Sequence, residues 1–121
     1  MALTEFGKAV RKARIDIGTT LLSMAQELGV TSAFLSGLET GTKKISLEWI
    51  KKIDQYFRDK NHQIENLEEL AHVANKVVPL DGLSTQQQML VAGFAKSEFT
   101  TEQLRQFAEL LQQVNKLDEV K

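Results

Sequence analysis

The 121-residue sequence contains no cysteine, and this absence excludes disulfide bonds and thiolate metal sites. It has a single proline, and aromatic residues make up only 7% of the chain. No apolar run approaches the ~20 residues that cross a bilayer, and the first residues (MALTEFGKAVRK) lack the apolar core of a signal peptide. We therefore expect a cytoplasmic protein with no membrane partner.

Motifs that carry chemistry are missing as well. The two histidines, His62 and His72, are not part of an HExxH motif and do not have the spacing of a paired metal site. The sequence also lacks a nucleophile elbow, a P-loop and a GxGxxG pattern. It predicts no enzyme, no metal site and no cofactor.

Charge is distributed unevenly along a chain whose formal net charge is −1. Residues 1–60 contain ten Lys and Arg against seven Asp and Glu, whereas residues 61–121 contain five against nine. Binding to phosphates requires a local basic face rather than a basic whole protein. The asymmetry modestly favours a nucleic-acid partner for the first half.

Apolar residues at helical spacing, together with capping residues, predict an all-α fold without strands. The first four helices are expected at residues 4–17, 21–28, 32–39 and 47–58, with N-caps at Thr4, Thr20, Thr31 and Ser46. Three C-terminal helices are expected from residue 66 to 78, from Ser84 to about Ser97, and from Thr100 to about Lys116. The polar stretch 58–63 separates a domain at 1–60 from a helical region at 61–121.

The most informative segment is TLLSMAQELGVTSAFLSGLETG, residues 20–41. It predicts two short helices joined by a tight turn at Gly29, with one apolar face shared by both helices. Such a pair is the unit that places a helix in the DNA major groove. The segment therefore predicts a sequence-specific DNA-binding protein, and the alternative is a surface helix of a protein-binding domain.

The stretch from Phe6 to Phe57 resembles the Xre/Cro-repressor type of helix-turn-helix domain. The match covers under half of the chain and runs through Ala25, Leu28-Gly29-Val30, Leu35, Leu38 and Glu39-x-Gly41. This resemblance implies a four-helix, lambda-repressor-like domain in a transcriptional regulator. It also implies an ion pair between Arg14 and Glu39, either buried or solvated.

The same resemblance implies which residues contact DNA. The expected base-reading residues are Thr31, Ser32, Ala33, Ser36 and Gly37. They depart from the usual pattern, because such positions commonly hold Gln, Arg or Lys. The expected backbone-contacting residues are Thr20, Leu21, Thr40, Thr42, Lys43 and Lys44. Phe34 either packs on the start of the helix at 21–28 or lies against the edge of the DNA.

The last predicted helix carries an apolar stripe that suggests a dimer interface formed by Leu104, Phe107, Leu111 and Val114. Alternatively, the stripe packs on the helix that begins near Ser84 within one chain. We expect a homodimeric repressor that binds an inverted-repeat operator on double-stranded DNA. The alternative function is an antitoxin-type protein-interaction module whose DNA-binding domain regulates its own gene.

Overall fold

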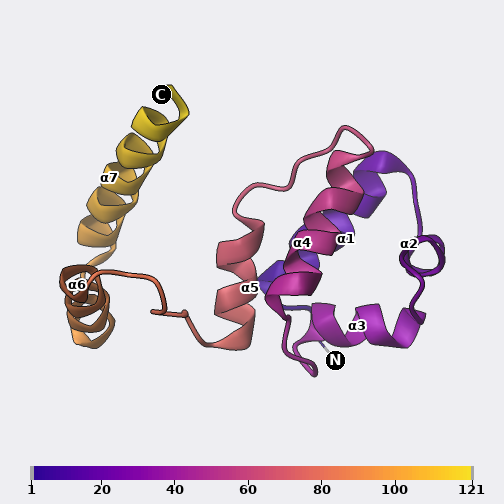
Figure 1. Ribbon diagram of the computed structural model, residues 1–121, viewed down its shortest axis with the longest axis horizontal. Helices are drawn as coiled ribbons and strands as arrows, with labels where there is room; N and C mark the ends of the chain where they lie inside the picture. Colours follow the sequence, from indigo (N-terminus) through magenta and orange to yellow (C-terminus); the bar gives the residue numbers. More distant parts are fainter. Residues whose placement is uncertain (1, 121) are drawn as a thin grey trace. The chain divides into compact units, whose positions relative to one another are not determined.

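The computed structural model describes the backbone of residues 2–120 and the side chains of residues 2–115. Within residues 2–120 all regular structure is helical, in agreement with the predicted all-α class, and no strand is present (Figure 1). The helices are α1 (Glu5–Ile17), α2 (Leu21–Leu28), α3 (Ser32–Thr40), α4 (Leu47–Arg58), α5 (Leu67–Asn75), α6 (Thr85–Lys96) and α7 (Thr101–Val120).

Local capping interactions fix where the first four helices begin and end. Each begins after a Ser or Thr whose hydroxyl accepts the N–H of the residue three positions later, at Thr4, Thr20, Thr31 and Ser46. The first three end at glycines in the left-handed conformation, Gly18, Gly29 and Gly41. These boundaries lie within one residue of those predicted from the sequence.

The chain forms two compact units, one up to Pro79 and the other from Leu80 onward. The boundary is therefore not in the polar stretch 58–63, as the sequence suggested, because α5 belongs to the first unit. Leu67 and Ala71 of α5 are buried, and α5 packs on α1 and α4. In Figure 1, α5 lies on the opposite side of the first unit from α2.

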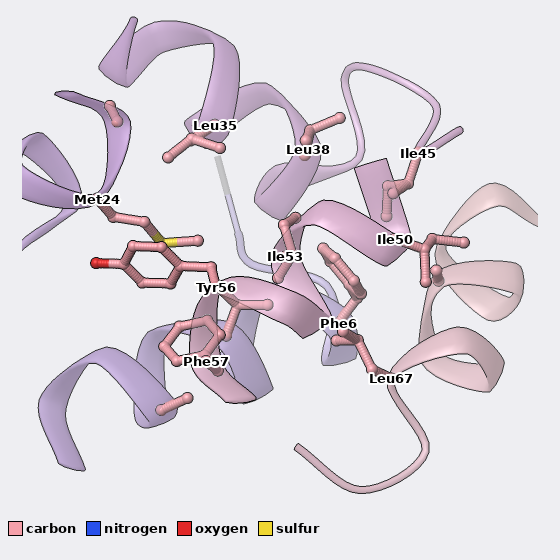
Figure 2. Close-up of a cluster of buried hydrophobic side chains, with 14 residues drawn as sticks. Phe6, Met24, Leu35, Leu38, Ile45, Ile50, Ile53, Tyr56, Phe57 and Leu67 are labelled. Carbon is pink, nitrogen blue, oxygen red and sulfur yellow. The ribbon is translucent and has the colours of Figure 1, made fainter. Parts of the chain in front are cut away.

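One hydrophobic core holds the first unit together, and every one of its five helices contributes to it. Phe6 of α1, Ile53 of α4 and Leu67 of α5 come together at one end of this core, while Met24 of α2 and Leu35 of α3 line the other (Figure 2). Phe6 is fully buried. The core fixes α3 from one side only, and this leaves the opposite side of that helix at the surface.

The second unit consists of α6 and α7, and it differs sharply from the first because none of the side chains described between Leu80 and Asn115 is buried. Capping boxes begin both helices, at Ser84 with Gln87 and at Thr100 with Gln103. The aromatic rings of Phe94, Phe99 and Phe107 pack on one another.

The apolar residues expected to form a dimer interface lie on α7. Leu104, Phe107, Leu111 and Val114 are all exposed. Phe107 contacts α6 through Phe94, with ring centroids 5.2 Å apart. The alternative that the stripe packs on α6 within one chain therefore holds at the aromatic rings. The other residues of the stripe, Leu104, Leu111 and Val114, stay exposed.

Between residues 2 and 120, no helix combines the length and the apolar character needed to cross a bilayer.

Candidate functional site

The candidate site is built on α3, which has one buried face and one open face. Leu35 and Leu38 point into the core and are almost fully buried. On the other side of the helix Ala33 is exposed, and Ser32 and Ser36 are half-buried. Small, partly polar side chains therefore form the outer surface of α3.

The turn between α2 and α3 sets the start of this surface. Gly29 adopts φ 74°, a left-handed conformation that side chains other than glycine's rarely adopt. The N–H of Val30 donates to the carbonyl of Ala25 at 2.9 Å, which ties the turn to the end of α2. Thr31 is exposed and caps α3 by accepting the Phe34 N–H. Only three residues separate α2 from α3, and the two helices pack on each other.

The ion pair between Arg14 and Glu39 joins α1 to the end of α3. Two guanidinium nitrogens of Arg14 donate to the two carboxylate oxygens of Glu39, at 2.6 Å and 3.0 Å. The two side chains are 7% and 4% exposed, so this is the buried form of the pair. A bidentate contact of this kind fixes both the distance and the orientation of the helices that carry it.

A second attachment of α3 to α1 is made through the backbone and was not expected from the sequence. The carbonyl of Glu39 accepts both the N–H and the hydroxyl of Thr4, each at 3.0 Å. Gly7 allows this approach, because a Cβ at this position would lie 2.1 Å from that carbonyl oxygen. A glycine inside an otherwise regular helix is the one feature of the sequence that could have indicated this contact.

Gly37 does not occupy the position expected of a base-reading residue. It is buried beneath the loop after α3, where a Cβ would lie 3.0 Å from the side chain of Lys43 and 3.2 Å from that of Thr42. Its carbonyl accepts the Lys43 N–H and the Thr42 hydroxyl. Gly37 thus brings the loop close to α3 and presents no surface to a groove.

The expected backbone-contacting residues lie around α3 in two groups. Lys43 and Lys44 are exposed in the loop after α3, and Thr20 and Leu21 stand at the start of α2. The hydroxyls of Thr40 and Thr42 donate to the carbonyls of Ser36 and Gly37, so these two threonines shape the loop. Thr20 uses its hydroxyl to accept the Ser23 N–H.

Phe34 makes a contact that neither of the two expectations named. Its ring packs on Trp49 of α4, with centroids 4.9 Å apart and planes inclined by 57°. The Lys43 ammonium lies 5.9 Å from the Phe34 ring centre, and that of Lys52 lies 4.9 Å from the Trp49 ring centre. The aromatic pair holds the outer edge of α3 against α4.

Asn75 holds the loop after α3 from the side of α5. Its side-chain oxygen accepts the Ile45 N–H at 2.8 Å, and its side-chain nitrogen donates to the Ile45 carbonyl at 2.9 Å. The side-chain amide of Asn75 therefore takes the place of a backbone partner for both the N–H and the carbonyl of Ile45. The sequence offered no signal for this contact, which joins positions 30 residues apart.

The end of α2 is attached to α4 through a charged hydrogen-bond network. The Tyr56 hydroxyl donates to Glu27 at 2.6 Å, and the Lys60 ammonium lies 3.2 Å from the same carboxylate. Burial, followed by the hydrogen bond to Glu27, raises the pKa of Tyr56 to about 12. The hydrogen bonds from Tyr56 and Lys60 lower the pKa of Glu27.

Among the residues that the structure describes, no three His, Asp or Glu side chains gather as metal ligands. His62 lies 3.9 Å from Asp16, and His72 lies 3.8 Å from Glu68. Each histidine thus stands beside a single carboxylate.

Because the first unit extends to Pro79, its net charge is less positive than that of the predicted domain at 1–60. Up to Pro79 it contains eleven Lys and Arg against ten Asp and Glu, because α5 and the segment before it add three glutamates. The excess of basic over acidic residues is therefore smaller than in residues 1–60, where ten Lys and Arg stand against seven Asp and Glu. Any attraction for phosphate would therefore come from local groups of exposed basic side chains, such as Lys43 and Lys44, rather than from the charge of the whole unit.

Comparison of the chain with protein-family models, with curated proteins and with solved structures finds no match.

Proposed function

We propose that the first unit is a helix-turn-helix domain that binds double-stranded DNA, with α3 in the major groove, and that the protein regulates transcription. The observation that carries this proposal is the outer face of α3. Ser32, Ala33 and Ser36 form a narrow surface without long side chains on a helix that is fixed from its buried side. A helix held in this way can enter a groove about 12 Å wide without rearranging the core.

The short side chains define how bases are read. Serine hydroxyls at positions 32 and 36 donate to or accept from base edges, directly or through a water molecule, and the Ala33 methyl suits a thymine methyl. None of these residues makes the bidentate contact that arginine makes to guanine or glutamine to adenine. A substantial part of the specificity therefore comes from the shape and deformability of the DNA.

Phosphate contacts fix the position of the domain in this proposal. Lys43 and Lys44 flank α3 on a loop that Gly37 allows to approach the helix and that Asn75 ties to α5. The first turn of α2, with Thr20 and Leu21, offers backbone N–H groups and the positive end of a helix dipole. Such contacts supply affinity that depends on salt and not on sequence.

The following experiment distinguishes base reading by Ser36 from phosphate contact by Lys43 and Lys44. A duplex is selected from random DNA by the full chain, and its affinity and that of a scrambled duplex are measured across a range of salt concentrations. Lys43→Gln combined with Lys44→Gln should weaken binding to both duplexes equally, and should flatten the slope of log affinity against log salt by roughly 1–2. Glutamine keeps the Cγ methylene of Lys43 that lies beside Gly37 and removes the charge.

Ser36→Ala should instead reduce the preference for the selected duplex by about 0.5–1.5 kcal/mol, the contribution of a single hydrogen bond, and leave the salt slope unchanged. The control is Lys76→Gln combined with Lys96→Gln, which removes the same charge at positions outside the α2–α3 region. The proposal is wrong if the full chain enriches no sequence, or if the control variant alters the slope as much as the Lys43 and Lys44 variant does.

A further inference from the structure

We infer that a further group of DNA-phosphate contacts lies on α4, where Trp49 and Lys52 extend the binding surface beyond the loop after α3. The inference rests on the proposed function and deepens it, because it adds residues of α4 to the set that contacts the DNA backbone. The side chains concerned are Phe34, Lys43, Trp49 and Lys52, and together they are called the Trp49 patch.

A continuous series of contacts joins the Trp49 patch to the surface of α3. The stem of Lys43 lies beside Gly37 of α3, where a Cβ would be 3.0 Å from the lysine Cδ. The ammonium of the same lysine lies 5.9 Å from the Phe34 ring centre. Phe34 in turn packs on Trp49, and the Lys52 ammonium lies 4.9 Å from the Trp49 ring centre. Lys43 therefore belongs both to the proposed phosphate contacts and to the patch, which continues them onto α4.

The two aromatic rings restrain the ammonium groups of the patch. Lys43 and Lys52 are exposed, and each ammonium lies within about 6 Å of a ring centre, the range in which a cation is attracted to the face of a ring. A long side chain loses rotamer freedom when it binds a phosphate, and a side chain that is already restrained loses less. Both ammonium groups are thus held for an anion and remain accessible to it.

Trp49 also supplies a hydrogen-bond donor. Its side chain is half-buried, and its indole N–H makes no hydrogen bond within the described part of the chain. Since every buried side-chain nitrogen and oxygen of the described residues has a partner, this N–H reaches solvent. An indole nitrogen donates and does not accept, so it suits a phosphate oxygen and not a cation. Because the patch borders α3, the phosphates that reach it belong to the duplex whose bases α3 reads.

One carboxylate competes with DNA for the patch. Glu48 lies 3.0 Å from the Lys52 ammonium, and the two side chains are 70% and 49% exposed. An exposed pair of this kind contributes little stability, so Lys52 can leave it at little cost. Contact with a DNA phosphate additionally releases condensed counterions, which a single carboxylate does not provide. Lys52 therefore exchanges Glu48 for a phosphate when DNA binds.

Binding of the selected duplex by the full chain across a range of salt concentrations tests the inference. Lys52→Gln should weaken binding to the selected and the scrambled duplex alike, and should flatten the slope of log affinity against log salt by about 0.9, the value of one phosphate contact. The matched control is Lys51→Gln, which removes the same charge at the preceding position of α4. Lys51 lines a groove between α4 and α5 that neither Trp49 nor Lys52 lines, so this variant should keep the wild-type slope.

Replacement of single phosphates in the selected duplex by neutral methylphosphonates locates the contact. Wild-type protein should lose affinity when phosphates outside the enriched base pairs are replaced, and Lys52→Gln should no longer respond to those replacements. Glu48→Gln should raise the affinity by up to about five-fold, because it removes the competing carboxylate. This gain should be absent when Glu48→Gln is combined with Lys52→Gln.

Thermal unfolding without DNA, followed by the fluorescence of Trp49, verifies that each variant is folded. The inference is overturned, and the proposed function is not, if DNA binds but Lys52→Gln keeps the wild-type slope or loses no more than Lys51→Gln does. A wild-type chain that binds no duplex would overturn the proposed function and this inference together, so the two failures are distinguishable.

Discussion

Removal of one partner of the buried Arg14–Glu39 pair should destabilise the first unit severely. In Glu39→Ala the guanidinium of Arg14 keeps its charge, loses both hydrogen bonds and remains 7% exposed in the native arrangement. Breaking a buried pair on one side typically costs about 3–5 kcal/mol. For a unit of about 80 residues, this loss should lower the melting temperature by at least roughly 12 °C.

The double variant Arg14→Met with Glu39→Leu distinguishes the buried charge from the lost packing. Apolar replacements of similar volume restore the contact between α1 and α3 without leaving an unpaired ion, so this variant should be more stable than Glu39→Ala. An exposed pair provides the control: Lys52 and Glu48 are 49% and 70% exposed, and Lys52→Ala should change stability by less than about 1 kcal/mol.

The assay is urea unfolding at neutral pH, followed by the fluorescence of Trp49, which reports on the first unit alone. A free energy of unfolding for Glu39→Ala within 1 kcal/mol of the wild-type value would refute the reasoning. So would a double variant less stable than Glu39→Ala, since the structural argument rests on the uncompensated charge.

Three further results are expected from substitutions or pH changes within the first unit. Gly7→Ala should destabilise it by about 1–3 kcal/mol or more in thermal unfolding, because the new methyl group would overlap the carbonyl oxygen of Glu39. Asn75→Ala should reduce the free energy of unfolding by about 1–3 kcal/mol in urea, since it leaves two backbone groups without partners. Absorbance titration should show the only tyrosine, Tyr56, ionising at a pKa of about 12, and Glu27→Gln should lower this value only in part because burial is its main cause.

The sign of the tyrosine effect on stability follows from the direction of its shift. The folded pKa of Tyr56 lies above its ordinary value of 10.0. Its contribution to stability is therefore complete below pH 10 and is lost as the pH rises toward 12.

For Gly7→Ala the control is Gly93→Ala, because a Cβ at Gly93 of α6 meets no atom within 4 Å. A loss of stability at both glycines would contradict the steric explanation.

Helix boundaries could be predicted from the sequence because they depend on residues close to one another. Threonine or serine before each of the first four helices and glycine after three of them act within one turn of chain. The buried residues Phe6, Val10, Leu35 and Leu38 were predictable for the same reason, since their helical spacing defines a face.

Features that depend on distant contacts were not predictable in this way. The polar stretch 58–63 suggested a domain boundary, yet the chain returns through α5 to cover α1 and α4. Gly37 had the spacing of an outward-facing residue, but the loop at Lys43 folds over it. The packing of Phe34 on Trp49 joins two helices whose relative orientation no local pattern specifies.

The central claim is that the surface of α3 recognises a DNA sequence, and selection of bound duplexes from a random pool tests it most directly. The full chain should enrich one sequence whose central positions change when Ser32 or Ser36 is substituted. A pool that remains random after repeated rounds at low salt, with the first unit folded, would contradict the account.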